Sequence, residues 1–110
     1  MPRLDKSLIF PKGITVRSHR MFQRYVVDTA LLEGWLVYYT PDSRWSPKGI
    51  TDLILAKGGA VLFWELKMPD DKLKPDQQEW KGVLEGCEGV EYGLFYPQDL
   101  DSMVRRLING

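Results

Sequence analysis

The sequence predicts one mixed α/β domain whose elements follow the order αβββαβα, and three observations lead to this prediction. The chain has 110 residues, of which 44% are apolar and 12% aromatic, which is enough to bury one hydrophobic core. Four short segments are rich in β-branched and aromatic residues, a composition typical of strands. Three other segments repeat apolar residues at helical spacing.

The first expected helix covers residues 19–33. Ser18 can cap its N-terminus, and Gly34 can end it. Its apolar stripe consists of Phe22, Val26 and Ala30. The segment WLVYY, residues 35–39, predicts the first strand, and the turn-forming residues of 40–49 predict a loop.

Two strands joined by a tight turn follow this loop. The segments ITDLILA (50–56) and AVLFWELK (60–67) have the composition of strands. Between them, Gly58 and Gly59 are suited to a two-residue hairpin turn. We therefore expect these two strands to pair as a β-hairpin.

A second helix and a final strand and helix complete the predicted domain. The second helix starts at Pro75, because proline suits the first helical turn, and runs to about Cys87. We expect Cys87 to pack in the core, because apolar residues precede it at helical spacing. The segment VEYGLFY (90–96) predicts the fourth strand. The closing amphipathic helix carries Leu100, Met103, Val104, Leu107 and Ile108.

The charges are unevenly distributed along the chain, although they sum to zero. Residues 1–27 hold six basic residues and one acidic residue, whereas residues 68–101 hold nine acidic and three basic residues. Zero net charge argues against a general nucleic-acid binder, but the asymmetry predicts one face for a polyanion. Residues 1–17 are expected to form a basic N-terminal arm and residues 18–110 the folded domain. The alternative is an arm that contacts only solvent.

The sequence contains no apolar run of about 18 residues and no signal-peptide pattern. Its single cysteine excludes an intrachain disulfide and any multi-cysteine metal site. These features predict a cytoplasmic protein that does not bind membranes.

The predicted hairpin places two carboxylates opposite each other. With Gly58 and Gly59 in the turn, Asp52 faces Glu65 directly across the pair of strands, and two like charges so placed are destabilising. Lys67 lies two residues beyond Glu65 and therefore on the same face. Two carboxylates with room for water form the oxygen-rich surroundings that Mg²⁺ prefers.

The opposite face of the same strand carries Leu62, Trp64 and Leu66, so we expect Trp64 in the core or in an interface. The alternative interpretation of Asp52, Glu65 and Lys67 is a structural ion-pair cluster. A register slip of one residue would also turn Asp52 away from Glu65.

At these residues the sequence resembles the VRR-NUC (virus-type replication-repair nuclease) family of the PD-(D/E)XK nuclease superfamily. The resemblance rests on GITDLILAKGGAVLFWELK followed by KLKPDQQEW, and it extends from about Phe22 to Asp101. It implies a restriction-endonuclease-like αβββαβ core. It also implies metal-binding carboxylates at Asp52 and Glu65, a catalytic lysine at Lys67 and the motif glutamine at Gln77. The implied cofactor is Mg²⁺ or Mn²⁺.

One position departs from the family. Its members usually carry a glutamate four residues before the glutamine that corresponds to Gln23, where this chain has His19. Imidazole suits Mn²⁺ better than Mg²⁺, so His19 is a possible variant metal ligand or phosphate contact. A lone histidine in a first helical turn is more often simply solvated.

Several residues are candidates for contacts with DNA. Arg44 and Lys48 lie in the loop that leads into Asp52 and can contact phosphates, and Tyr39 and Trp45 offer stacking surfaces there. On the first helix, the candidates are Arg20, Gln23 and Arg24.

The resemblance predicts a divalent-metal-dependent DNA endonuclease of bacterial or bacteriophage type, acting in replication, recombination or repair. Stand-alone domains of this size resemble homodimeric Holliday-junction resolvases, which need two active sites facing opposite strands. The alternative is a catalytically weak DNA-binding module that uses the nuclease fold within a replication or recombination complex. His19 favours this alternative, whereas Asp52, Glu65 and Lys67 oppose it.

Overall fold

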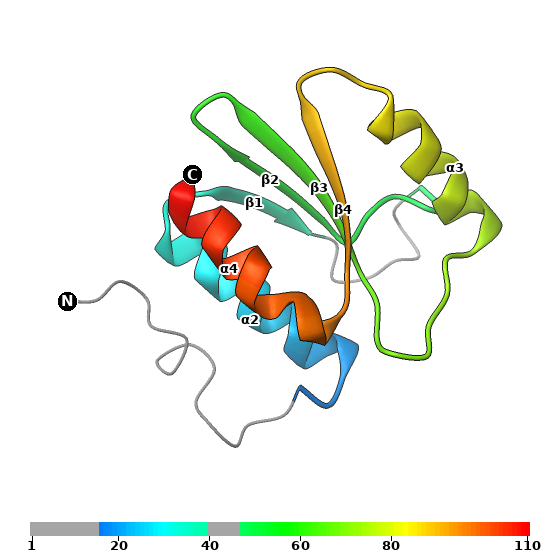
Figure 1. The fold of residues 1–110 in the computed structure, drawn as a ribbon, viewed down its shortest axis with the longest axis horizontal. Coiled ribbons are helices and arrows are strands. Elements are labelled where there is room, and N and C mark those ends of the chain that lie inside the picture. The colour runs from blue at the N-terminus through cyan, green and yellow to red at the C-terminus, as the bar shows by residue number, and fades with distance from the viewer. Residues whose placement is uncertain (1–15, 40–46) are drawn as a thin grey trace.

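The structure is a computed structural model that describes residues 16–39 and 47–110. Its elements are α2 (His19–Leu32), β1 (Leu36–Tyr39), β2 (Leu53–Lys57), β3 (Ala60–Leu66), α3 (Pro75–Glu85), β4 (Val90–Phe95), the 3-10 turn η2 (Pro97–Asp99) and α4 (Leu100–Asn109). The predicted order αβββαβα is thus confirmed, with η2 added before the last helix (Figure 1).

The four strands form one mixed sheet in the order β1-β2-β3-β4. β1, β2 and β3 pair antiparallel, whereas β3 and β4 pair parallel. In the hairpin, Lys57 pairs with Ala60 and Leu53 with Trp64, which is the predicted register. Asp52 lies one residue before β2. Continuing the register by one residue beyond the Leu53–Trp64 pair would place it opposite Glu65 of β3.

The core lies between one face of the sheet and two helices. α2 and α4 lie side by side on that face, and α3 lies on the other (Figure 1). Inward-facing residues of β3, including Trp64 at 2% exposure, meet the apolar stripe of α2 in this core, as the alternation predicts. The largest fully buried side chains include Phe22, Val26, Leu53, Leu55, Leu62, Leu66, Met103 and Leu107.

The predicted ends of two helices are confirmed in detail. The hydroxyl oxygen of Ser18 accepts a hydrogen bond from the Met21 amide at 3.1 Å and so caps α2. Gly34 follows the end of α2 with φ +88°, a left-handed conformation that glycine adopts without strain. Pro75 is the first residue of α3.

Two local predictions need correction. Cys87 is exposed, because α3 ends at Glu85 and buries only Leu84, so the predicted apolar stripe stops short of the cysteine. The second strand begins at Leu53 and not at residue 50.

Most of the predicted arm and most of the loop, including Arg44 and Trp45, lie outside the described residues. Among the residues that are described, no helix has the length and apolar character that crossing a membrane requires.

Candidate functional site

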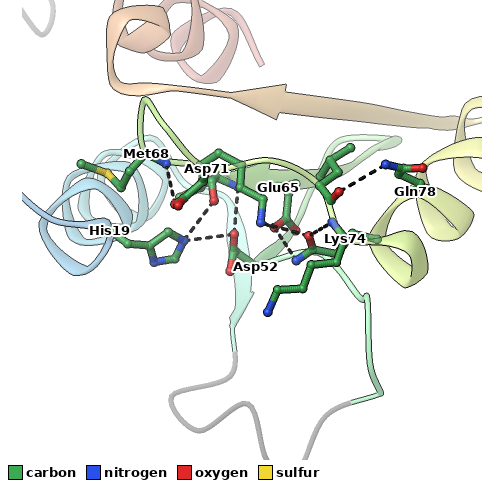
Figure 2. A network of polar contacts seen from close by, with 11 residues as sticks. His19, Asp52, Glu65, Met68, Asp71, Lys74 and Gln78 are labelled. Carbon is green, nitrogen blue, oxygen red and sulfur yellow. Dashed lines mark hydrogen bonds and ion pairs between the residues drawn. The ribbon is translucent and has the colours of Figure 1, made fainter.

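Four predicted site residues meet at one end of the two central strands, where β2 begins and β3 ends. Asp52 directly precedes β2, Glu65 lies near the end of β3, Lys67 directly follows β3, and Gln77 lies in the first turn of α3. His19, at the start of α2, reaches the same place (Figure 2). The structure thus brings these five side chains close together, and their catalytic and metal-binding roles stay predictions.

Asp52 is anchored by the backbone of the neighbouring strand. Its Oδ2 accepts a hydrogen bond from the Leu66 amide at 2.8 Å. The carboxylate thus takes the place of a backbone acceptor just beyond the paired residues of β2. This bond holds Asp52 beside β3, with its side chain half-buried.

Glu65, Lys67 and Gln77 form a connected polar network. Lys67 Nζ donates to Gln77 Oε1 at 3.0 Å and lies 3.7 Å from Glu65 Oε2. Gln77 Nε2 donates to the same Glu65 Oε2 at 3.2 Å. Gln77 Oε1 also accepts from the Lys74 amide at 2.9 Å, so both of its oxygen contacts are donors and its nitrogen faces a carboxylate. The amide orientation of Gln77 follows from these charges.

The surroundings of Glu65 compensate the charge of its ionised form only in part. The residue is 3% exposed, and its Oε1 has no hydrogen-bond partner among the described residues. Burial, reinforced by the nearby charge of Asp52, raises the pKa of Glu65 to about 7, although Lys67 and His19 oppose this rise. A further cation at this position would offset the electrostatic repulsion between the two neighbouring carboxylates.

His19 is not simply solvated, as a lone histidine at a helix start usually is. Its Nε2 lies 3.3 Å from Asp52 Oδ2 and 3.1 Å from the Leu66 carbonyl oxygen. Both neighbours are acceptors, so Nε2 carries a proton in this arrangement. The hydrogen bond to Asp52 raises the pKa of His19, with burial opposing. A metal ligated by Nε2 would first have to replace this proton.

The donor atoms at the site suit a hard divalent cation. Asp52 Oδ2 and the Leu66 carbonyl oxygen both face His19 Nε2, and Glu65 Oε1 lacks a partner among the described residues. Within residues 16–39 and 47–110, no group of three or more His, Cys, Asp or Glu side chains is arranged to hold a metal. An ion here would therefore need a backbone carbonyl and water as further ligands, as Mg²⁺ commonly does.

The predicted DNA contacts lie on the surface near the site. Arg20 and Arg24 are exposed on α2, and Arg24 Nε bonds Asp28 at 3.1 Å. Gln23 is half-buried, one helical turn after His19. Lys48 is exposed in the segment that leads to Asp52, whereas the candidates Arg44 and Trp45 lie outside the described residues.

Two contributions at this site were not predicted from the sequence. The backbone of Leu66 binds Asp52 through its amide and His19 through its carbonyl, and no residue type signals such a role. Trp80 donates from Nε1 to the Lys48 carbonyl at 3.0 Å, which joins α3 to the segment before Asp52. The one sequence feature that could have indicated this role is the spacing of Trp80 from Gln77, which is nearly one helical turn and places both side chains on one face of α3.

Comparisons with protein-family models, curated proteins and solved structures return no match for this chain.

Proposed function

We propose that this chain is a divalent-metal-dependent DNA endonuclease of the VRR-NUC type with a PD-(D/E)XK site. The observation that carries this proposal is Glu65, a buried carboxylate beside Asp52 that shares Gln77 with Lys67. A purely structural ion pair would not need the second carboxylate or leave Oε1 without a partner among the described residues. This arrangement therefore supports a site for a cation.

The residues divide the work of phosphodiester hydrolysis among them. Asp52, Glu65 and the Leu66 carbonyl would hold Mg²⁺ or Mn²⁺, which when bound supplies Lewis acidity and lowers the pKa of water. Lys67 carries a positive charge that can position the attacking water or offset the charge developing on the phosphoryl group. Gln77 holds the Lys67 ammonium in place through a 3.0 Å hydrogen bond. Sequence resemblance and chemistry thus point to the same four residues.

The substrate class within this proposal is branched DNA, cleaved by a homodimer as in Holliday-junction resolvases. Support comes from exposed apolar side chains on the β1 side of the sheet that the described residues form. β1 is an edge strand, and Leu36 and Tyr38 are 75% and 58% exposed on it. Leu31 and Leu32, at the end of α2, are also more than half exposed. A second copy covering this surface would bring two sites into one particle.

A second candidate function is a DNA-binding module with weak or no catalysis. The observation that favours it is His19, whose Nε2 lies between Asp52 Oδ2 and the Leu66 carbonyl. A protonated imidazole there supplies a positive charge to Asp52 without any metal.

One experiment separates the two functions. Matched single-stranded, duplex, flap and four-way-junction DNAs are incubated with the protein and with Mg²⁺, Mn²⁺ or a chelator, and products are resolved on denaturing gels. The endonuclease is expected to cut at least one substrate only when the metal is present. Tight binding without cleavage under all these conditions would establish the binding module instead.

A further inference from the structure

The first turn of α3 needs an anchor, because Gln77 must stay beside Lys67 and Glu65. Among the described residues of α3, only Leu84, near the far end of the helix, is buried. Burial of Leu84 therefore secures the C-terminal half of α3, which packs against β4, and leaves the first turn to other contacts.

Trp80 supplies such a contact. Its indole Nε1 donates to the carbonyl of Lys48 at 3.0 Å, a bond between residues that are 32 positions apart in the chain. Trp80 follows Gln77 by three residues, so the two side chains leave neighbouring positions on the surface of α3. One reaches the end of β3, and the other reaches the segment that leads into β2.

At Gly49 the backbone before Asp52 packs so closely against α3 that no side chain larger than hydrogen fits. A Cβ atom built on Gly49 would lie 2.5 Å from the Asp76 carbonyl oxygen and 2.8 Å from Cδ1 of the Trp80 ring. Its φ is +86°, which glycine adopts without strain and other residues rarely adopt. The backbone before Asp52 therefore rests directly on the first turn of α3.

We propose that Trp80 and Gly49 form a positioning clamp that holds Asp52 in place relative to Glu65, Lys67 and Gln77. The clamp rests on the proposed nuclease function, since its purpose is the geometry of that site. Asp52 follows Gly49 by three residues, and Gln77 precedes Trp80 by three. The contact between Gly49 and Trp80 therefore holds the segment that carries Asp52 against the helical turn that carries Gln77. Trp80 acts through these residues and needs no contact with the substrate.

The clamp is tested with Trp80→Phe and a matched control, Trp35→Phe. Each variant keeps an aromatic ring and loses one indole-to-carbonyl hydrogen bond, because Trp35 Nε1 donates to the Leu107 carbonyl at 2.9 Å in the core. Trp80→Phe is expected to lower kcat by about tenfold or more, since small misplacements of reacting groups are costly, with KM for DNA within about threefold. Trp35→Phe is expected to lower the melting temperature and to leave kcat per folded molecule unchanged.

Gly49→Ala provides a second variant that disturbs the clamp from the other side. It is expected to lower kcat in the same way as Trp80→Phe, because the added methyl group forces the Lys48–Ile50 backbone away from Asp76. If both variants keep kcat within twofold of the wild type, or lose activity only in proportion to the fraction of unfolded protein, the proposal is overturned.

A readout without DNA or metal separates the clamp from the nuclease function. His19 is the only histidine of the chain, and its ring contacts Asp52, so its NMR signals report the position of Asp52. Trp80→Phe should shift these signals at constant pH, whereas Trp35→Phe should not. If the wild type cuts no DNA, the nuclease proposal fails, and the His19 signals decide the clamp alone. Unshifted His19 signals in Trp80→Phe then overturn the clamp.

Discussion

Glu65 shows how the fold places a charge where ionisation costs free energy. Its side chain is buried next to Asp52. The Lys67 ammonium lies 3.7 Å from Glu65 Oε2 and donates its hydrogen bond to Gln77 instead. The pKa of Glu65 is therefore raised to about 7, and the protonated form is favoured below that pH. A metal ion bound at the site would favour the ionised form instead.

This raised pKa predicts an unusual pH dependence for the stability of the metal-free protein. The folded state holds the Glu65 proton up to about pH 7, whereas the unfolded chain loses it near 4.5. The free energy of unfolding should therefore fall as the pH rises from 4.5 to 7, by on the order of 3 kcal/mol. His19 acts in the same direction, because its raised pKa adds stability below 6.5 that is lost as the pH rises through its folded value.

Urea unfolding in a chelating buffer at several pH values measures this effect. Glu65→Gln should flatten most of the decline, since the amide does not titrate. A wild-type stability that increases steadily between pH 5 and 7 would contradict the raised pKa of Glu65.

Neutralising either carboxylate should stop catalysis while leaving the fold intact. Asp52→Asn keeps an oxygen that can accept from the Leu66 amide, and Glu65→Gln keeps the shape of the side chain. We expect cleavage to be abolished and DNA binding to stay within a few-fold, because the metal loses a ligand but the basic surface remains. Removing one of two like charges should also stabilise the metal-free protein. Turnover at the wild-type rate by either variant would remove these residues from the site.

Under the proposed nuclease function, His19 should determine which metal supports cleavage. If it has replaced a carboxylate ligand, the site has lost one oxygen donor, and the wild type should prefer Mn²⁺ to Mg²⁺. His19→Glu should raise the Mg²⁺-supported rate, and His19→Ala should lower the rate with both ions. Cleavage rates measured over a range of both metal concentrations check this prediction. Wild-type behaviour of His19→Ala with both ions would make His19 a bystander.

At the level of elements, Lys57 connects the ends of two helices to the hairpin. Its Nζ donates to the carbonyl of Glu33, just after α2, at 2.6 Å. The same nitrogen is 3.8 Å from where a Cβ of Gly110 would lie, just after α4. It also lies 5.9 Å from the centre of the Trp35 ring. A single ammonium group therefore meets the negative ends of both helices.

Removing this charge should destabilise the protein measurably. Lys57→Met keeps most of the aliphatic stem but loses the hydrogen bond and the interaction with the helix ends. We expect a loss of about 1–2 kcal/mol in the free energy of unfolding, measured by denaturant titration. The matched control, Lys72→Met at an exposed position, should stay within about 0.5 kcal/mol of the wild type. An equal effect of both variants would show that Lys57 has no special role.

At the level of the whole molecule, basic residues lie along α2 next to the site. Arg20 and Arg24 are exposed on α2 one helical turn apart, and Arg17, also exposed, lies two residues before the helix. The ion pair of Arg24 with Asp28 is exposed and therefore weak, so it leaves Arg24 available to a phosphate. The charge asymmetry of the sequence thus places exposed basic residues on α2 and directly before it.

If this surface binds phosphates, each contact contributes to the salt dependence of DNA binding. Replacing Arg17, Arg20, Arg24 or Lys48 by alanine should weaken binding of all sequences to a similar extent and reduce the slope of log K against log salt by about 0.9 per contact. Fluorescence anisotropy over a range of salt concentrations measures the slope. Arg105→Ala, exposed on α4, serves as the control and should leave the slope unchanged. Unchanged slopes in the α2 variants would show that these arginines contact only solvent.

The sequence alone determined the elements and the register that brings the carboxylates together. Hydrophobic periodicity and turn residues act over a few neighbouring positions, so the helices, the strands and the Gly58–Gly59 turn could be predicted locally. Because side chains alternate along a strand, the turn also determined that Asp52 and Glu65 share a face. The boundaries were less certain, as Cys87 shows, because the end of a helix depends on what it packs against.

Only the tertiary structure decided how the charges of the site are held. The proton on His19 Nε2 depends on Leu66 and Asp52, which come from two other elements. The raised pKa of Glu65 depends on burial, which is a property of the packed molecule and not of a segment. The bond from Trp80 to Lys48 joins residues 32 positions apart. Contacts of this kind leave no local pattern in a sequence, because their free energy arises only when distant segments are packed together.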